Sequence, residues 1–243
     1  MRYLMISDIH GNLEALQAAL ELADKFKPYQ LVCLGDIVGY GADPKACIDI
    51  MGEKANLVLA GNHDLAVAGI ISSEDFNPIA LESLKWTEGI LSDEEKELLA
   101  NLPLQYIDGD YCFTHASPIE PMNFHYVRTV EDVEEVFSAI GQRFCFIGHT
   151  HLPVIARISM ENGKLDIVRE TRTDLLDEFR YFVNVGSIGQ PRDSNPDACM
   201  VLFDEEYQTL EFIRVPYDIT TSRDKIISEG LPSYLAERLT LAR

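Results

Sequence analysis

The chain has 243 residues, 47% of them hydrophobic, which is enough to bury a substantial core in one or two domains. Its 40 acidic residues outnumber its 20 basic ones, and the formal net charge of -20 argues against duplex nucleic acid or an acidic lipid surface as a partner. A small phosphorylated substrate is compatible with this charge, because charges beyond about 8 Å are screened at physiological ionic strength. A divalent metal inside a site would also attract such an anion.

The five cysteines show neither CxxC spacing nor an even number, so we expect them to be reduced and buried. The chain opens into an apolar run without a charged leader, and no run approaches 18 apolar residues. We therefore expect a cytoplasmic protein without a membrane partner. The composition leaves its oligomeric state open, homo-oligomers included.

In chain order, the first half predicts alternating strands and helices. The first apolar run is followed by Asn12, which can cap a helix with apolar residues at helical spacing that ends before Pro28. A second apolar run leads to Gly35, a helix begins at Asp43, and a third strand ends at Ala60. This order is typical of parallel βαβ units.

The second half predicts mostly strands. Residues 62–102 are first expected to be largely helical, with a start signal at Ser92, and we interpret residues 65–102 as a helical insertion or cap near the edge of the site. Later helices are expected around residues 130–140, 222–227 and 234–239. Strands are expected at residues 105–107, 111–114, 144–147, 154–160, 165–169, 182–185, 200–203 and 210–215. The pattern predicts two sheets packed face to face with helices outside, in a single domain of residues 1–243.

Short apolar runs end in side chains that can bind a metal. Because open α/β sheets place their sites at the carboxyl ends of strands, we expect one shared site for Asp8, His10, Asp36, Asn62, His115, His149 and His151. Four of these ligands form two pairs with a spacing of two residues, Asp8 with His10 and His149 with His151. The members of each pair are expected to point the same way, as in a strand. Glycines before three ligands, at Gly35, Gly61 and Gly148, allow close approach of the backbone.

The chemistry of this set predicts a transition-metal centre. Imidazole, carboxylate and amide ligands suit Mn, Fe, Zn or Ni better than Ca or Mg. Seven ligands are too many for one ion and fit two ions that share one ligand. We therefore expect a dinuclear centre.

The ordered blocks around these ligands resemble the calcineurin-like metallophosphoesterase superfamily. They are Asp8-Ile9-His10, Gly35-Asp36, Gly61-Asn62-His63-Asp64, Thr114-His115 and Gly148-His149-Thr150-His151. The resemblance implies an α/β fold, a four-layer αββα sandwich of two mixed sheets flanked by helices. It also implies that Asp36 bridges two ions, with Asp8, His10 and His151 on the first and Asn62, His115 and His149 on the second. The segments at residues 8–12, 115–118 and 185–192 look closest to the bacterial and archaeal phosphodiesterase-like branch, which includes diadenosine tetraphosphatase-like members.

The same resemblance implies a hydrolase of phosphate esters. Two ions, about 3.5 to 4 Å apart in such sites, would hold a bridging hydroxide that attacks phosphorus in line. We expect manganese, with iron, zinc, nickel or cobalt as alternatives. His63 is carried over as the group that stabilises the transition state or protonates the leaving oxygen. Arg192 is the candidate phosphate clamp, and Asn12 has equal claims as a helix cap and as a phosphate contact.

One block departs from the superfamily pattern and narrows the substrate. Protein serine/threonine phosphatases of the superfamily read GDxVDRG, whereas this chain has Gly39 and Tyr40 in place of the Asp and Arg that orient the catalytic histidine and grip a phosphomonoester. This favours phosphodiesters or dinucleoside polyphosphates as substrates. One alternative is a phosphomonoesterase, including a protein phosphatase of another subtype, in which Arg192 or Arg128 would bind the phosphate. The other is a catalytically silent scaffold such as the retromer subunit that resembles this superfamily. The complete ligand set and His63 argue against the scaffold.

Overall fold

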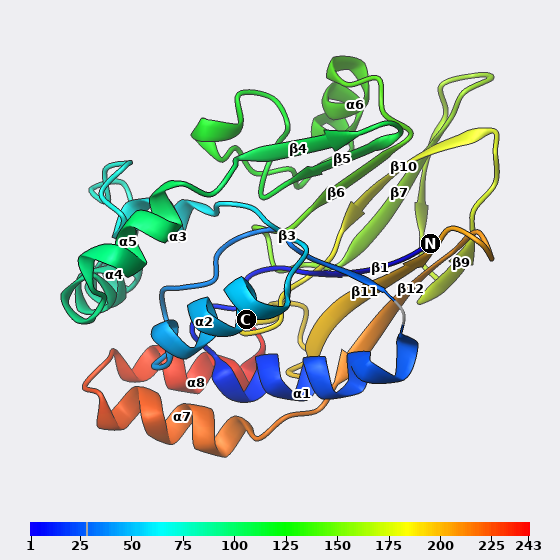
Figure 1. Cartoon of the computed structure of the whole chain (residues 1–243). Helices are drawn as coiled ribbons and strands as arrows, with labels where there is room; N and C mark the ends of the chain where they lie inside the picture. The colour runs from blue at the N-terminus through cyan, green and yellow to red at the C-terminus, as the bar shows by residue number, and fades with distance from the viewer. Residues whose placement is uncertain (28) are drawn as a thin grey trace.

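The computed structural model describes residues 1–27 and 29–243, and in these residues two mixed sheets of six strands each pack face to face (Figure 1). Helices α1, α2, α7 and α8 lie outside one sheet, and α6 lies outside the other (Figure 1). The four-layer αββα sandwich predicted from the sequence is confirmed.

The first sheet is built around the N-terminal strand. Its order is β3 (Leu57–Val58), β2 (Gln30–Cys33), β1 (Arg2–Ile6), β11 (Ala198–Asp204), β12 (Thr209–Val215) and β9 (Arg172–Asp174). The first three strands are parallel, as the βαβ pattern predicts, and the other pairs are antiparallel. The second sheet has the order β4 (Gln105–Asp108), β5 (Tyr111–Thr114), β6 (Phe144–Ile147), β10 (Phe179–Asn184), β7 (Val154–Ser159) and β8 (Leu165–Val168).

Alternate residues of the strands face different layers, as strand geometry requires. In β1, Met5 lies in the apolar cluster between the sheets, whereas Leu4 and Ile6 lie in the cluster under the helices. In β6, Phe146 faces the other sheet and Cys145 faces the side of α6. Both faces of these central strands are therefore buried, which explains why β1 and β6 read as continuous apolar runs.

The helices cover the two faces and one end of the sandwich. The first sheet is covered by α1 (Leu13–Ala23), α2 (Pro44–Lys54), α7 (Ile219–Ser228) and α8 (Ser233–Leu241), and the second by α6 (Val130–Ala139). The segment between β3 and β4 holds α3 (Asn62–Val67), α4 (Pro78–Ile90) and α5 (Asp93–Ala100). Short 3-10 turns occupy Asp24–Phe26 and Pro121–Asn123. None of the helices in residues 1–27 and 29–243 has the length and apolarity needed to cross a membrane.

The structure differs from the predicted elements at a few points. The strand β9 was missed because Arg172–Asp174 is a short polar edge strand without an apolar pattern. The third strand is only two residues long, and β10 starts three residues earlier than expected, at Phe179. The predicted helix end at Pro28 lies outside the described residues; α1 ends at Ala23 and a 3-10 turn follows. All five cysteines are buried and free, as predicted.

Candidate metal centre

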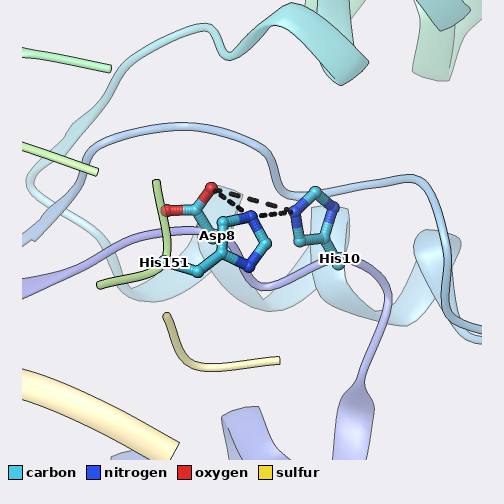
Figure 2. A group of neighbouring side chains, drawn as sticks. All are labelled: Asp8, His10 and His151. Carbon is cyan, nitrogen blue, oxygen red and sulfur yellow. Dashed lines mark hydrogen bonds and ion pairs between the residues drawn. The ribbon is translucent and has the colours of Figure 1, made fainter. Parts of the chain in front are cut away.

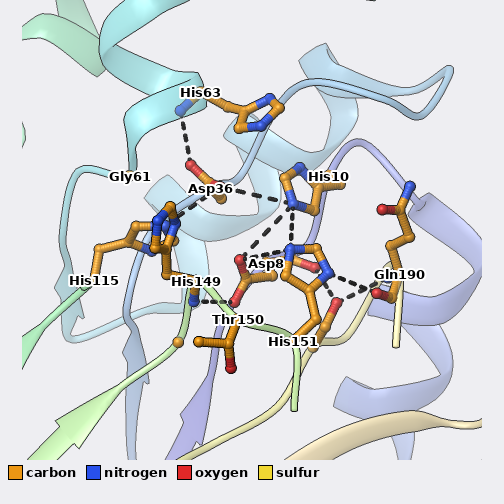
Figure 3. A network of polar contacts seen from close by, with 12 residues as sticks. Asp8, His10, Asp36, Gly61, His63, His115, His149, Thr150, His151 and Gln190 are labelled. Carbon is orange, nitrogen blue, oxygen red and sulfur yellow. Dashed lines mark hydrogen bonds and ion pairs between the residues drawn. The ribbon is translucent and has the colours of Figure 1, made fainter. Parts of the chain in front are cut away.

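The loops that follow four strands converge at one end of the sandwich (Figure 3). Asp8 and His10 follow β1, and Asp36 follows β2. From the second sheet, His115 follows β5, and the loop after β6 carries the remaining histidines of the predicted set, His149 and His151. Both sheets therefore contribute predicted ligands to one place, as expected from their positions after the strands.

Five of these ligands have a left-handed backbone: Asp8 (φ 53°), His10 (φ 50°), Asp36 (φ 53°), His149 (φ 67°) and His151 (φ 61°). This conformation costs a non-glycine residue roughly 1–2 kcal/mol, and the surrounding structure must offset it. The expectation that strand alternation aims each pair is therefore wrong. The residues lie beyond the strand ends, and sharp left-handed turns aim their side chains instead.

Two of the predicted glycines are required by close packing at the centre. A Cβ on Gly61 would lie 2.0 Å from Asp36 Oδ1, and one on Gly148 would lie 2.6 Å from Asp8 Oδ2. No side chain can occupy either position while the carboxylates keep their places. The loops can therefore close around the centre only because these residues lack a side chain.

Asp8, His10 and His151 form a first cluster, with their ligand atoms within 4.8 Å of one another (Figure 2). His151 Nε2 is 3.1 Å from Asp8 Oδ1, and His10 Nε2 is 3.8 Å from the same oxygen. The two Nε2 atoms are 3.2 Å apart. All three side chains are buried, so these polar atoms cannot be satisfied by bulk water.

Asp36, His115 and His149 form a second cluster, and Asp36 also reaches the first one. Asp36 Oδ2 is 3.3 Å from His115 Nε2 and 3.7 Å from His10 Nε2 (Figure 3). Asn62 opens α3, and its Oδ1 atom is buried. The carboxylate of Asp36 therefore stands between the two groups of side chains.

Backbone carbonyls fix the tautomers of three histidines. A carbonyl can only accept, so each Nδ1 that faces one must carry a proton, and in a neutral ring the Nε2 lone pair then points into the centre. The pairs, with their N···O distances, are His10 with Val38 (3.1 Å), His115 with Leu34 (2.9 Å) and His151 with Gln190 (2.6 Å).

This orientation places electron-rich atoms face to face. The Nε2 lone pairs of His10 and His151 point at each other, and Asp8 Oδ1, Asn62 Oδ1 and His115 Nε2 have no hydrogen-bond partner within the described part of the chain. Buried polar atoms without partners cost roughly 1–3 kcal/mol each, and more when they are charged. A divalent cation would bind the lone pairs of these atoms. Hydrogen bonds from the other ring nitrogen to backbone carbonyls are also typical of metal-binding histidines. The side chains therefore fit transition-metal ions.

The protonation states suit cation binding. Burial opposes ionisation of Asp8, but the neighbouring His151 holds its pKa below the usual range. Burial also opposes ionisation of Asp36, but His115, His63 and His10 together outweigh it, so the pKa of Asp36 lies well below its ordinary value. Burial acts to lower the pKa of His115, but Asp36 raises it to about 9. His115 must therefore release a proton when it binds a metal.

The other predicted histidine ligands are neutral at pH 7. Burial lowers the pKa of His149 to about 3 and lowers those of His10 and His151 as well. The ring of His149 is held by stacking: the Tyr126 ring lies 4.1 Å from it at an interplanar angle of 22°, and the Arg128 guanidinium lies 3.7 Å from the Tyr126 centroid. No motif in the sequence indicates this stack, because Tyr126 lies outside the ligand blocks. Arg128, the alternative phosphate-binding residue, has its guanidinium over the Tyr126 ring.

His63 lies beside the clusters in an aromatic setting. Its ring contacts those of Tyr40 (centroids 4.5 Å apart), His10 (4.8 Å) and Phe76 (5.1 Å). Its Nδ1 atom is buried without a hydrogen-bond partner in the described residues, and burial lowers its pKa to about 4. Aromatic packing therefore takes the place of the orienting carboxylate that protein phosphatases carry at the position of Gly39. Phe76 belongs to the helical segment predicted to lie near the site.

Asp64, next in the chain, organises the loops around the centre. Its carboxylate accepts hydrogen bonds from the main-chain nitrogens of Ile37 (2.9 Å), Val38 (3.1 Å) and Gly61 (2.9 Å). Asp36 in turn accepts from the nitrogen of His63 (2.9 Å). Asp64 therefore joins the first turn of α3 to the loops around the centre.

The two predicted substrate contacts are placed differently. Arg192 lies beside the first cluster: its main-chain nitrogen donates to His151 O (3.3 Å), and Nη2 donates to Gln190 Oε1 (3.0 Å). Asn12 Oδ1 accepts from Ala15 N (3.2 Å), which is the predicted helix cap, and its Nδ2 donates to Gly189 O (2.9 Å). A phosphate contact stays a prediction for Asn12, and it would require the side chain to give up these hydrogen bonds.

The fold and the site together define a class. A two-sheet sandwich with buried imidazoles and carboxylates at the strand ends is the framework of a metal-dependent phosphoesterase. Residues 1–168 match the family model for the calcineurin-like phosphoesterase, and this chain belongs to that family. It is a phosphoric ester hydrolase, as the resemblance predicted.

Known proteins similar to this chain agree. The chain is 38% identical to uncharacterized protein MJ0912 of Methanocaldococcus jannaschii, over 98% of this chain and 97% of that protein. It is 33% identical to a symmetrical bis(5'-nucleosyl)-tetraphosphatase of Edwardsiella ictaluri, over 48% of this chain and 43% of the relative. The crystal structure of a metallophosphoesterase from Sphaerobacter thermophilus superposes with a TM-score of 0.86 at 36% identity, covering 100% of this chain and 99% of that one.

Proposed function

We propose that this protein hydrolyses phosphodiesters or dinucleoside polyphosphates at a centre of two divalent transition-metal ions. The observation that carries the proposal is the position of Asp36, whose Oδ2 atom lies 3.3 Å from His115 Nε2 in one cluster and 3.7 Å from His10 Nε2 in the other. A shared carboxylate between two sets of donors is the arrangement that two neighbouring ions require.

Asp8, His10, Asp36 and His151 would hold the first ion, and Asp36, Asn62, His115 and His149 the second. Bound divalent ions supply Lewis acidity: they lower the pKa of a bound water toward neutrality and withdraw charge from phosphoryl oxygens. Manganese is the ion we propose first, with iron, zinc, nickel and cobalt as alternatives.

His63 and Arg192 would act on the substrate. His63 is neutral at pH 7, because burial lowers its pKa to about 4, so it can donate a hydrogen bond to a phosphoryl or leaving oxygen without carrying a charge. Arg192 has a buried Nε without a partner among the described residues, and its guanidinium can pair with phosphate oxygens.

The substrate class is supported by two observations. Gly39 and Tyr40 stand where a protein phosphatase has the Asp and Arg that serve phosphomonoesters, and the Tyr40 ring is packed against His10 and His63. Partial relatives of this chain are named symmetrical bis(5'-nucleosyl)-tetraphosphatases. We propose a small phosphorylated molecule as the partner. The cytoplasmic location expected from the sequence stays a prediction.

The test is hydrolysis by the purified protein with and without manganese. Bis(p-nitrophenyl) phosphate, p-nitrophenyl phosphate and diadenosine tetraphosphate are compared, and bound metal is measured in the same samples. We expect faster turnover of the diester than of the monoester, and loss of both after chelation. Faster turnover of the monoester would favour the phosphomonoesterase, and metal binding without any hydrolysis would contradict the proposal.

A further inference from the structure

The C-terminal helix α8 packs close to the metal centre. Its residues Leu235 and Leu239 lie in one buried apolar cluster with Tyr40. The Tyr40 ring in turn lies 4.6 Å from that of His10 and 4.5 Å from that of His63. One side chain therefore separates this helix from the proposed catalytic residues.

The loop that carries Arg192 is joined to the same helix. The main-chain nitrogen of Ser194 donates to the carbonyl of Ala242, just after α8, at 3.0 Å. A small hollow is lined by residues of both segments, among them Gln190 and Leu239, and by His10 of the centre. The loop and the helix thus form one wall beside the metal ligands.

This wall carries two arginines without acidic partners. Neither Arg192 nor Arg238 forms an ion pair within 4.0 Å among residues 1–27 and 29–243. Half-buried Arg238 donates from Nε to the main-chain oxygen of Arg243 (2.6 Å), which leaves its Nη atoms for another acceptor. By contrast, Lys225 on the neighbouring helix is paired with two carboxylates.

The two arginines are close enough for their charges to interact. Burial lowers the pKa of Arg238, and the positive charge of Arg192 lowers it further. Both positive charges also lower the pKa of the Tyr40 hydroxyl, which burial raises. The hydrogen bond from the main-chain nitrogen of Arg192 to the carbonyl of His151 (3.3 Å) places Arg192 beside the centre. Arg238 lies on α8 between Leu235 and Leu239, on the side of Tyr40.

We propose that Arg192 and Arg238 form one anion-binding subsite beside the metal centre, which takes the phosphoryl groups next to the one that is hydrolysed. The substrate is then an ester with a chain of at least two phosphates, rather than a simple diester with one phosphorus. This inference rests on the proposed function, because the scissile phosphate must lie at the metal centre.

The chemistry explains why two guanidinium groups select a phosphate chain. Each guanidinium pairs with two oxygens of one phosphoryl group, so a single phosphate at the centre can engage Arg192 but leaves Arg238 without a partner. A second phosphate would relieve the repulsion between the two positive charges. Removing one such charged hydrogen-bonded contact weakens binding roughly ten- to a hundredfold.

The first arm of the test measures binding. The manganese-loaded wild-type protein is titrated by calorimetry with β,γ-methylene adenosine triphosphate, a non-hydrolysable probe with a phosphate chain, and the titration is repeated with R238Q, R238K and R172Q. We expect R238Q to weaken binding roughly ten- to a hundredfold and R238K to weaken it less, because lysine keeps the charge but not the fork geometry. Arg172 lies exposed on the edge strand β9, and R172Q is the matched control for loss of one positive charge.

The second arm measures selectivity. The ratio of kcat/KM for diadenosine tetraphosphate to that for bis(p-nitrophenyl) phosphate should fall at least about tenfold in R238Q and stay constant in R172Q. Thermal unfolding shows whether R238Q is folded, and a loss of stability alone would leave this ratio unchanged. Equal probe binding by R238Q and wild type, or an unchanged ratio, overturns the subsite. Absence of any hydrolysis by the wild type overturns the proposed function instead, and the calorimetric arm then still decides the subsite.

Discussion

Replacing Gly39 by alanine should displace His63 without touching the metal ligands. The nearest atoms to a Cβ at Gly39 all belong to His63, and Nδ1 would be only 2.4 Å away. Ordinary contact begins at 3.4 Å, so the ring must move by about 1 Å. A displacement of that size at a reacting group can lower turnover about a hundredfold. We therefore expect kcat to fall by about two orders of magnitude while both metals stay bound.

The assay is hydrolysis of bis(p-nitrophenyl) phosphate with manganese, together with metal analysis of the same protein. Gly39 has a φ of +85°, so alanine also strains the backbone there by roughly 1–2 kcal/mol. Gly163→Ala is the matched control, because Gly163 has a φ of +69° and open space around its Cβ position. A Gly39→Ala protein with full metal content and a kcat within about threefold of wild type would refute the role of His63, since a 1 Å displacement should cost far more.

Three further outcomes are expected. Asp36→Asn should retain at most one metal per chain and lose turnover, because the carboxylate between the clusters is gone. Elemental analysis and the hydrolysis assay check this, and two retained ions would contradict a bridging Asp36. Manganese at a hundred times its Kd should raise the free energy of unfolding by about 2.7 kcal/mol over chelated protein, read from urea titrations, and an unchanged midpoint would count against a folded-state metal site. In chelated protein, burial lowers the pKa of His63 from 6.5 to about 4, so the unfolded chain takes up the proton first as pH falls through this window, and stability is lost. From pH 7 to pH 5 the wild type should therefore lose about 2 kcal/mol relative to His63→Asn in paired urea titrations, and parallel pH profiles would refute the buried neutral histidine.

The sequence predicted that these side chains meet because each of them closely follows an apolar run. Asp8 and Asp36 come two and three residues after β1 and β2, and parallel strands place such residues at one edge whatever the details of the loops. The layers followed from the same strands, since Met5 and its neighbours alternate between two apolar clusters.

The contacts that refine the site could not be predicted in this way. Tyr126 stacks on His149, Phe76 meets the His63 ring edge to face, and α8 packs in one cluster with Tyr40. Each pair is separated in the chain and belongs to no periodic pattern. The left-handed turns were also missed, because a strand pattern says nothing about the backbone beyond the strand's end. What decides the orientation of the ligands is therefore the packing of loops, which a single sequence does not display.

A crystal of the manganese-loaded protein, measured at the manganese absorption edge, tests the dinuclear centre most directly. We expect two anomalous peaks, one beside Asp8, His10 and His151 and the other beside Asn62, His115 and His149, with the Asp36 carboxylate touching both. A single peak, or two peaks with Asp36 turned away from either ion, would contradict the dinuclear centre.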